Sequence, residues 1–222
     1  MADAPLPRWL ARLVLLVFWA VVIGLIALAG ALWAGAADSR PPGRQLTEYA
    51  FADLRQWELS ADAGVTVAPD PGGLRATFSG PDQWVFALRE SPGVPFSLEA
   101  GGAQTAGEPG LALGLAFGYS DRQNFVAVLL NNNGYAQAFA RAGGAVREWF
   151  PFGQWPHILS LEANRVRLEV SADGEAVVRI NDEVLTKFRA AEFAALKGKV
   201  GVAARANAAG QVLFNWVKVW SR

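Results

Sequence analysis

Polar and apolar residues alternate over most of the chain after residue 44, which is the pattern of strands with one buried face. The clearest case is 165–171, where polar and apolar side chains alternate without exception. Asp173-Gly174 then supplies a tight turn, and 176–180 returns as the partner strand. Further strands are predicted at 57–59, 65–67, 74–78, 84–88, 96–100, 111–119, 124–130, 134–141, 200–205 and 212–220. Residues 190–196 alone have a helical pattern here. So many short strands predict an antiparallel sandwich or barrel.

A different pattern occupies residues 13–37, which contain no charged side chain. About 20 apolar residues cross the hydrocarbon core of a bilayer, so this run predicts one transmembrane helix. Trp9 and Trp33 lie near its ends, where aromatic rings favour the headgroup region. The alternative is a cleaved secretory signal with residues 34–36 as its cleavage site. Because the apolar core of a signal has only about 7–15 residues, we expect an uncleaved anchor.

The chain is predicted to have four parts. These are a short tail at 1–12, the transmembrane helix at 13–37, a linker at 38–44 and one β domain at 45–222. The linker contains Pro41-Pro42 and Gly43, which favour a stiff, non-helical connection. Arginines lie on both sides of the apolar run, so the count of positive charges does not decide its orientation.

Small residues form a stripe along the predicted helix. Ala20, Gly24, Ala27, Ala31 and Ala34 follow one another at steps of four, three, four and three residues. Such a stripe lets a second helix approach closely in lipid, so one interpretation is a packed partner helix. The alternative is that alanine and glycine are simply frequent in this chain.

Composition narrows the chemistry. Twenty Lys and Arg residues balance twenty Asp and Glu residues, so the whole chain has no basic field for nucleic acid. The lack of cysteine excludes disulfides, thiolate catalysis and zinc sites that need sulfur, and the single histidine, His157, excludes sites that need two. Asp121 with Asn124, and the run 131–133, are interpreted as turn residues rather than calcium ligands. No metal and no cofactor is therefore predicted.

Several short motifs occur in a characteristic order. They are Phe51-Ala52-Asp53-Leu54 with Trp57, Phe117-Gly118-Tyr119 with Asp121 and Asn124-Phe125, Trp155-Pro156-His157-Ile158, Asn164-Arg165-Val166, Ile180-Asn181, Gly198-Lys199-Val200-Gly201-Val202 and Phe214-Asn215-Trp216-Val217. Together they resemble the concanavalin A-like lectin/glucanase jelly rolls, especially the laminin-G-like and DUF1080-type members, over nearly all of residues 51–220. The resemblance implies an all-β, antiparallel jelly-roll β-sandwich behind the transmembrane helix. It also implies that this domain lies on the extracytoplasmic side of the cell membrane.

Glucanases that resemble this fold place their catalytic carboxylates on one strand as Glu-x-Asp-x-x-Glu. Hydrolysis needs two such groups about 5–10 Å apart, and this sequence contains no such spacing. Glu162, Glu169 and the Asp182-Glu183 pair, which is expected in a turn, are expected to be solvated surface carboxylates. His157 begins a strand, where we expect it to pack or cap, and no Gly-x-Ser-x-Gly elbow is present. We therefore predict no catalytic residue and no enzyme activity.

The most suggestive surface residues are aromatic. Trp149, Phe150, Phe152 and Trp155 lie in a stretch that also contains two prolines and a glycine, which predicts a loop. Exposed aromatic clusters mark surfaces that bind ligands or partners, so these four rings are the candidate binding residues. The alternative is that Trp149 and Phe152 fill the end of the sandwich and Trp155 lies under the next strand.

Two functional hypotheses follow. The one that we favour from the sequence is a non-catalytic, single-pass membrane accessory subunit, whose extracytoplasmic domain docks on or stabilises a larger membrane protein complex. The other is a membrane-tethered carbohydrate-binding, lectin-like module that uses the aromatic stretch. The expected partners are accordingly the lipid bilayer, other membrane-protein subunits and glycans, but not nucleic acid.

Overall fold

The protein is described by a computed structural model that covers residues 8–33, 44–49, 51, 53–160, 162–189 and 198–221. It forms two compact units, Met1–Arg40 and Pro41–Arg222. The predicted linker at 38–44 and the predicted helix at 190–196 fall outside the described residues, apart from Arg44.

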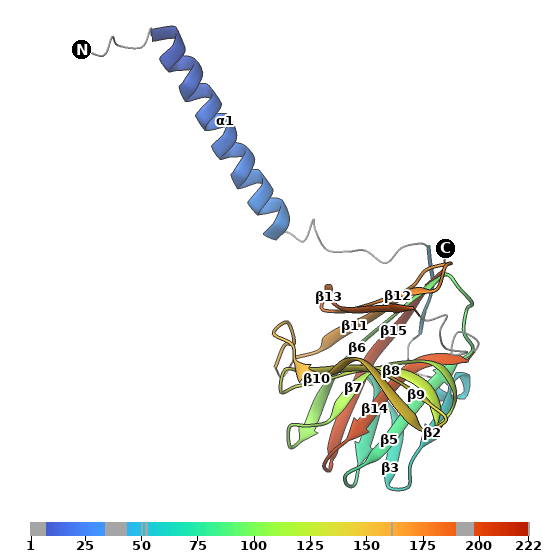
Figure 1. Ribbon diagram of the computed structural model, residues 1–222. Helices are drawn as coiled ribbons and strands as arrows, with labels where there is room; N and C mark the ends of the chain where they lie inside the picture. The colour runs from blue at the N-terminus through green and yellow to red at the C-terminus, as the bar shows by residue number, and fades with distance from the viewer. Residues whose placement is uncertain are drawn as a thin grey trace. The chain divides into compact units, whose positions relative to one another are not determined.

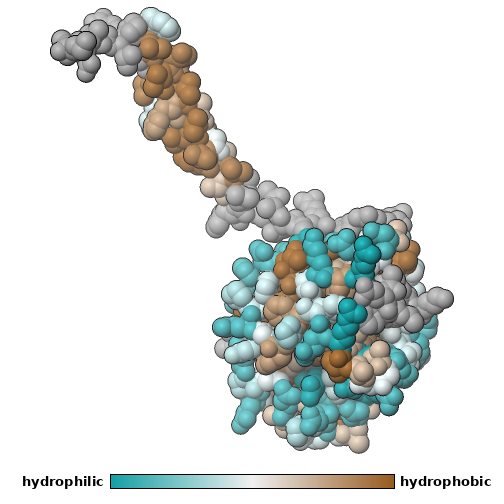
Figure 2. All heavy atoms as spheres, viewed as in Figure 1, coloured by the Kyte–Doolittle hydropathy of each residue, from teal (hydrophilic) through white to brown (hydrophobic). Residues whose placement is uncertain are grey.

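The first unit contains α1 (Arg8–Trp33), the helix drawn in blue in Figure 1. It begins directly after Pro7 and five residues before the apolar run, because residues 8–12 are mostly good helix formers. Its segment Arg12–Ala29 has a mean hydropathy of 2.6 and is long and apolar enough to cross a membrane, although a signal sequence meets the same criteria. Most of the hydrophobic side chains of α1 that the structure describes are solvent-exposed, and Figure 2 shows the apolar surface that they form.

The predicted stripe of small residues lies on this helix. Ala20, Gly24 and Ala27 are exposed, and a Cβ built on Gly24 would meet no atom within 4 Å. Ala34 and the side chain of Ala31 lie outside the described residues.

The second unit is a sandwich of two antiparallel sheets (Figure 1). The eight-stranded sheet has the order β13 (Glu183–Arg189), β12 (Glu175–Ile180), β11 (Asn164–Val170), β6 (Phe96–Gly107), β15 (Gly210–Ser221), β4 (Gly73–Phe78) and β3 (Val65–Asp70), with β1 (Arg44–Tyr49) beside β15. The seven-stranded sheet has the order β10 (Ala145–Gln154), β9 (Tyr135–Ala142), β8 (Asn124–Asn131), β7 (Ala112–Asp121), β14 (Lys199–Ala206), β5 (Gln83–Arg89) and β2 (Glu58–Ala61). A short 3-10 helix, η1 (Leu54–Gln56), precedes β2. The predicted all-β, antiparallel sandwich with one helix before it is confirmed.

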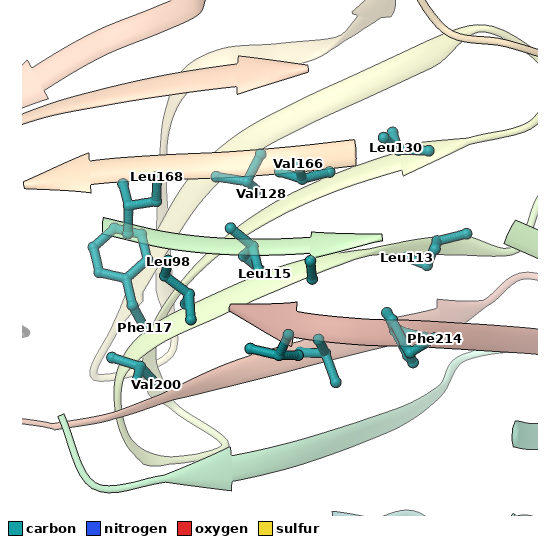
Figure 3. Packing of buried hydrophobic residues seen from close by; sticks show 14 of the residues in the cluster. Leu98, Leu113, Leu115, Phe117, Val128, Leu130, Val166, Leu168, Val200 and Phe214 are labelled. Carbon is teal, nitrogen blue, oxygen red and sulfur yellow. The ribbon is translucent and has the colours of Figure 1, made fainter. Parts of the chain in front are cut away.

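The main core lies between the two sheets. Alternate residues of the central strands point inward and interdigitate, among them Leu98, Leu115, Val128, Leu168 and Phe214 (Figure 3). All five are buried, as the alternation in the sequence requires. This packing fixes the opposite face of every strand as an outer face, which is where ligands can reach the sheets.

Every strand predicted from the sequence overlaps a strand of the structure, but three strands were not predicted: β1, β10 and β13. The loop predicted for the aromatic stretch is wrong, because this stretch forms most of β10. Its pairing with β9 shifts register between Glu148 and Phe150 and again between Phe150 and Gly153. Pro151 lies within the second irregularity, and β10 is an edge strand, which is where a sheet tolerates a residue without an N–H group.

Candidate functional site

The outer face of the seven-stranded sheet carries a second hydrophobic cluster, separate from the core. Its aromatic members, which we call the outer aromatic cluster, are Trp84, Phe86, Tyr119, Phe125 and Phe139. They come from four strands, β5, β7, β8 and β9. Large apolar side chains on the outer side of a sheet are unusual, because that side normally carries polar residues. This face is therefore the candidate functional surface.

The rings of the outer aromatic cluster touch one another. Trp84 and Phe86 stack with centroids 5.4 Å apart and planes 6° apart, while Phe125 meets Phe86 edge-on at 5.1 Å. The strands between them carry very small side chains on the same face: Gly114, Ala116, Ala127, Gly201 and Ala203. The three alanines are fully buried. The rings therefore share this face with a floor of alanine and glycine, which together with Leu129 is buried.

Three arginines lie over these rings. The guanidinium carbon of Arg122 is 4.9 Å from the centroid of Phe86, and those of Arg141 and Arg205 are 5.7 Å from Phe125 and Trp84 respectively. Such cation–π contacts are worth about 0.5–1 kcal/mol at exposed sites. They leave the hydrogen-bonding groups of the guanidinium available to other partners.

The arginines also have polar partners. Arg122 pairs with Asp62 at 3.2 Å, and its Nε donates to the hydroxyl of Ser60 at 3.1 Å. Arg205 pairs with Asp82 at 3.2 Å, but the Asp82 side chain is 82% exposed. An ion pair so open to solvent contributes little, because water and salt compete with it.

A row of side chains crosses this face from strand to strand. The paired residues are Trp84, Arg205, Ala112, Asn131, Tyr135 and Gln154, which we call the outer row. Residues directly opposite one another in paired strands point to the same face. With about 4.8 Å between neighbouring strands, the outer row is about 24 Å long.

One end of the outer row is an exposed aromatic stack. Tyr135 and Phe152 lie with their ring centroids 5.0 Å apart and their planes 9° apart. The two residues are 38% and 56% exposed. A stacked pair that remains this exposed presents a flat apolar surface to solvent.

The four aromatic residues predicted as a site do not share one surface. Trp149 stacks on Phe188 of β13, with centroids 3.9 Å apart and planes 11° apart. Phe150 and Trp155 meet edge-on at 6.0 Å, and with Trp149 they are half-buried against the core. Of the four, Phe152 alone is exposed. The role of Phe152 in binding stays a prediction. Its ring stacks on Tyr135 and does not form a surface with the other three predicted residues.

Sequence reasoning missed Trp84, Arg205 and Tyr135 as members of one surface. A partial signal was present in 84–88, where Trp84 and Phe86 occupy alternate positions and therefore the same face. Because β14 inserts between β5 and β7, the neighbours of these residues come from distant parts of the chain.

The outer face of the eight-stranded sheet is occupied by ion pairs. Arg167, whose side chain is only 3% exposed, lies 3.3 Å from Glu99, 3.1 Å from Glu169 and 3.2 Å from Asp182. Arg165 pairs with Asp182, and Arg179 with Glu169, which completes what we call the buried ion network. Burial raises the pKa of Glu99, and the guanidinium groups of Arg165 and Arg167 oppose this rise.

These contacts correct one expectation about the carboxylates. Glu162 and Glu183 are exposed as expected. Glu169 is not a solvated surface group, since Arg167 and Arg179 hold it in the buried ion network. The same expectation is wrong for Asp182, whose side chain is only 16% exposed and pairs with Arg167. An alternating strand places Glu169 on the outer side of β11, but alternation does not show that arginines from β11 and β12 enclose it there.

The other polar candidates have ordinary structural roles. The expectation that His157 begins a strand is wrong, because His157 lies in a turn and β11 begins only at Asn164. The carbonyl of His157 accepts a hydrogen bond from Asn181 Nδ2 at 2.7 Å, and the exposed ring lies 5.6 Å from that of Trp155. Asp121 accepts bonds from the Gln123 N–H and from Asn124 Nδ2, and the bond from Asn124 is the largest cause that lowers its pKa. Within the described ranges, no three Asp, Glu or His side chains are grouped to hold a metal ion.

No protein-family model matches the chain, and no curated protein sequence matches it. Solved structures match its fold. The carbohydrate-binding module CBM66 from Bacillus subtilis is 17% identical, with a TM-score of 0.56 over 73% of this chain and 95% of that one. A Bacillus subtilis protein of unknown function with a galectin-like fold is 13% identical, with a TM-score of 0.57 over 81% of this chain and 96% of that one.

A third similar structure is a GH16 protein from Bacteroides ovatus in complex with the product G4G4G3G. It is 10% identical, with a TM-score of 0.54 over 78% of this chain and 99% of that one. At such identities the likeness shows the fold alone. It confirms the jelly-roll β-sandwich that the sequence motifs predicted.

Proposed function

We propose that the chain is a carbohydrate-binding, lectin-like module. The observation that carries the proposal is the outer row, which ends in the exposed stack of Tyr135 on Phe152. Flat aromatic surfaces stack on the apolar faces of sugar rings. The ligand class is supported by the similar structures, since one is named a carbohydrate-binding module and another contains an oligosaccharide product.

The dimensions of the outer row favour an oligosaccharide over a single sugar. The row is about 24 Å long, which leaves room for several sugar residues between its two ends. Tyr135, with Phe152 stacked on it, supplies the stacking surface near one end, and Arg205, next to Trp84, supplies hydrogen-bond donors for hydroxyl or acidic groups near the other. Ala112 and Asn131 lie between them without a bulky outward side chain, because Asn131 Oδ1 is bonded to its own turn.

We propose that the module is not a glycosidase. Hydrolysis needs two carboxylates about 5–10 Å apart that flank the scissile bond. The six residues of the outer row include no carboxylate, and Asp82, which pairs with Arg205, lies at its edge. The GH16 likeness concerns the fold and brings no catalytic residue to this chain.

The proposal includes a membrane tether formed by α1, with the sandwich on the extracytoplasmic side of a cell membrane. The support is the length and apolar character of Arg12–Ala29. An accessory-subunit role would need a partner on the stripe of Ala20, Gly24 and Ala27. None of the similar structures named above is described as part of a membrane complex.

The test is retention of the full-length chain, in nanodiscs, on a panel of soluble polysaccharides (β-glucan, xylan, mannan, levan and pectin). We expect at least one of them to retain the protein. Phe152→Ala and Tyr135→Ala should each weaken that binding about tenfold, because each removes half of the stacking surface.

The matched control is Trp216→Ala, which removes an aromatic ring from the outer face of the other sheet, where Lys218 lies 4.6 Å from it. This variant should bind like the wild type. Retention by no polysaccharide would reject carbohydrate binding. Retention that is unchanged in both stack variants would reject the outer row as the site.

A further inference from the structure

Arginine side chains form a patch of the outer face beside the outer row. The patch lies on three rings of the outer aromatic cluster, Trp84, Phe86 and Phe125, which contact one another with centroids 5.4, 5.5 and 5.1 Å apart. A different guanidinium lies over each ring. We call the three side chains the arginine trio: Arg122, Arg141 and Arg205. Arg205 belongs to the outer row, but the proposed function leaves Arg122 and Arg141 without a role.

The arginine trio, and not the rings, forms the surface of this patch. Phe86 and Phe125 are buried, although both point to the outer side of their sheet. The side chains of Arg122 and Arg205 are 32% and 40% exposed, and Arg141 is also partly exposed. A ligand that approaches the patch therefore meets guanidinium groups.

Hydrogen bonds hold two members of the trio close together. Arg122 Nε donates to Ser60 Oγ, which shares a 3.1 Å hydrogen bond with the Tyr119 hydroxyl. Arg141 Nη1 donates to the backbone carbonyl of Arg122 at 3.4 Å. Side chains that are already ordered lose less conformational entropy when a ligand binds. The patch is thus arranged for binding before a ligand arrives.

The carboxylates beside the trio are open to solvent. Asp62, which pairs with Arg122, has a side chain that is 40% exposed, and Asp82, which pairs with Arg205, is more exposed still. Exposed ion pairs are weak, because water and salt compete with each partner. An anionic group on a ligand can therefore replace either carboxylate at small cost.

Arg141 has no carboxylate partner among the described residues. Its contacts are the ring of Phe125 and the carbonyl of Arg122. Glu148, a carboxylate on the neighbouring edge strand, accepts a hydrogen bond from Gln137 Nε2 at 2.6 Å instead. A guanidinium bonds more strongly to an anion than to a neutral carbonyl. Arg141 is therefore the member of the trio with the most capacity for an external anion.

The trio defines the charge of the ligand. A guanidinium is planar and donates two parallel hydrogen bonds to a carboxylate or a sulfate group. These two groups are the acidic substituents of polysaccharides, as uronic acids and as sulfate esters. Because Arg205 belongs both to the trio and to the outer row, one chain can stack on the row and place its acidic groups on the trio.

We infer that the polysaccharide bound by the outer row is acidic, and that the arginine trio binds its carboxylate or sulfate groups. The inference rests on the proposed function and narrows its ligand class. Three guanidinium groups over adjoining rings repel one another. A neutral sugar leaves this repulsion unchanged, whereas an anionic group beside them reduces it.

The test compares polysaccharides that differ in their charged groups alone. The full-length chain, in nanodiscs of zwitterionic phosphatidylcholine, is titrated with polygalacturonate and its methyl ester, and with dextran sulfate and dextran. The first pair tests carboxylates and the second tests sulfates. We expect the acidic member of at least one pair to bind at least tenfold more tightly than its neutral counterpart. This preference should weaken as salt is added.

Substitutions in the patch should change the preference in both directions. Arg122→Gln and Arg141→Gln should each weaken binding of the acidic member about tenfold, and Arg141→Lys should restore part of the loss, since it keeps the charge. Asp82→Asn removes the carboxylate that competes for Arg205 and should strengthen binding about threefold. A gain of this kind cannot result from misfolding.

The matched control is Arg75→Gln on the outer face of the other sheet. The Arg75 side chain is 41% exposed and pairs with Asp70, so the variant removes a charge of similar exposure. It should bind both pairs like the wild type, and thermal melting establishes that each variant is folded. Equal binding of the acidic and neutral members of both pairs would overturn the inference. An acidic preference that both glutamine variants leave unchanged would also overturn it.

The inference and the proposed function fail in different ways. Binding of neutral polysaccharides without a preference for the acidic members would overturn the acidic ligand class and leave carbohydrate binding standing. Binding of no polysaccharide, neutral or acidic, would reject both. Phe152→Ala should weaken binding of any polysaccharide that the chain retains, whereas Arg141→Gln should weaken binding of the acidic members alone.

Discussion

The two outer faces of the sandwich use arginine in opposite ways. On the eight-stranded sheet, Arg167 is enclosed by Glu99, Glu169 and Asp182 within 3.3 Å. On the seven-stranded sheet, Arg122, Arg141 and Arg205 lie over aromatic rings. Two of them also form ion pairs, but with the exposed carboxylates of Asp62 and Asp82. One face therefore encloses its charges among one another, while the other keeps its guanidinium groups on aromatic rings, beside carboxylates that are open to solvent.

This difference separates a structural face from a candidate binding face. Carboxylates that already share buried arginines have little capacity left for a ligand, and any ligand would have to displace an ion pair. A guanidinium on a ring pays a smaller desolvation cost and still offers donors at its edges. The choice of the candidate binding face thus depends on which groups each arginine contacts, and not on how many charged residues a face carries.

The largest effect should come from the same substitution made on each face. Arg167→Met leaves Glu99, Glu169 and Asp182 close together without their shared cation, so we expect a loss of about 3–5 kcal/mol of unfolding free energy. Arg141→Met removes a cation–π contact and one long hydrogen bond to the carbonyl of Arg122, and should cost about 1–2 kcal/mol. Urea unfolding of both variants, followed by tryptophan fluorescence, measures the difference. Equal losses would show that the two faces do not differ in the way described.

The sequence was enough to predict the architecture. Strict alternation at 165–171, followed by the Asp173-Gly174 turn, fixes a hairpin whose apolar residues face a core, and β11 and β12 have this form. Similar patterns predicted most other strands. Alternation of polar and apolar residues depends only on which face of a strand is buried. A strand can therefore be predicted from it even when the neighbouring strands are not known.

The sequence was not enough to predict the site, because the site depends on strand order. The outer row joins Trp84 on β5 to Tyr135 on β9 through β14, which lies far along the chain. Alternation indicates which residues share a face of one strand, but not which strands are neighbours. Pro151 and Gly153 also concealed β10, since an edge strand can contain them at irregular pairing where a central strand cannot.

A second prediction tests whether the outer aromatic cluster really covers its floor. Ala127 is paired with Ala116 and Phe139 and is fully buried, so Ala127→Leu must push the rings apart. Overpacking of this kind costs about 1–3 kcal/mol. Ala142→Leu, at an exposed position on β9, is the control and should be close to neutral. If Ala127→Leu is as stable as the control in urea, the rings do not form a closed layer.

The smallest effects come from a pair of matched aspartates. Asp182 and Asp82 both have a positive φ, of 73° and 55°, and each faces an arginine of its own outer face. Asparagine tolerates the same backbone conformation, so Asp182→Asn and Asp82→Asn change the charge with little added strain. We expect a loss of about 1–2 kcal/mol for Asp182→Asn, whose carboxylate is enclosed in the buried ion network. Asp82→Asn should cost about 0.5 kcal/mol or less, because its side chain is 82% exposed.

Repeating the urea unfolding at high salt sharpens the contrast, since salt screens the exposed pair and leaves the enclosed one almost unchanged. A salt dependence that is equal for the two variants would mean that the Asp182 pair is as open to solvent as the Asp82 pair, which would contradict the buried ion network.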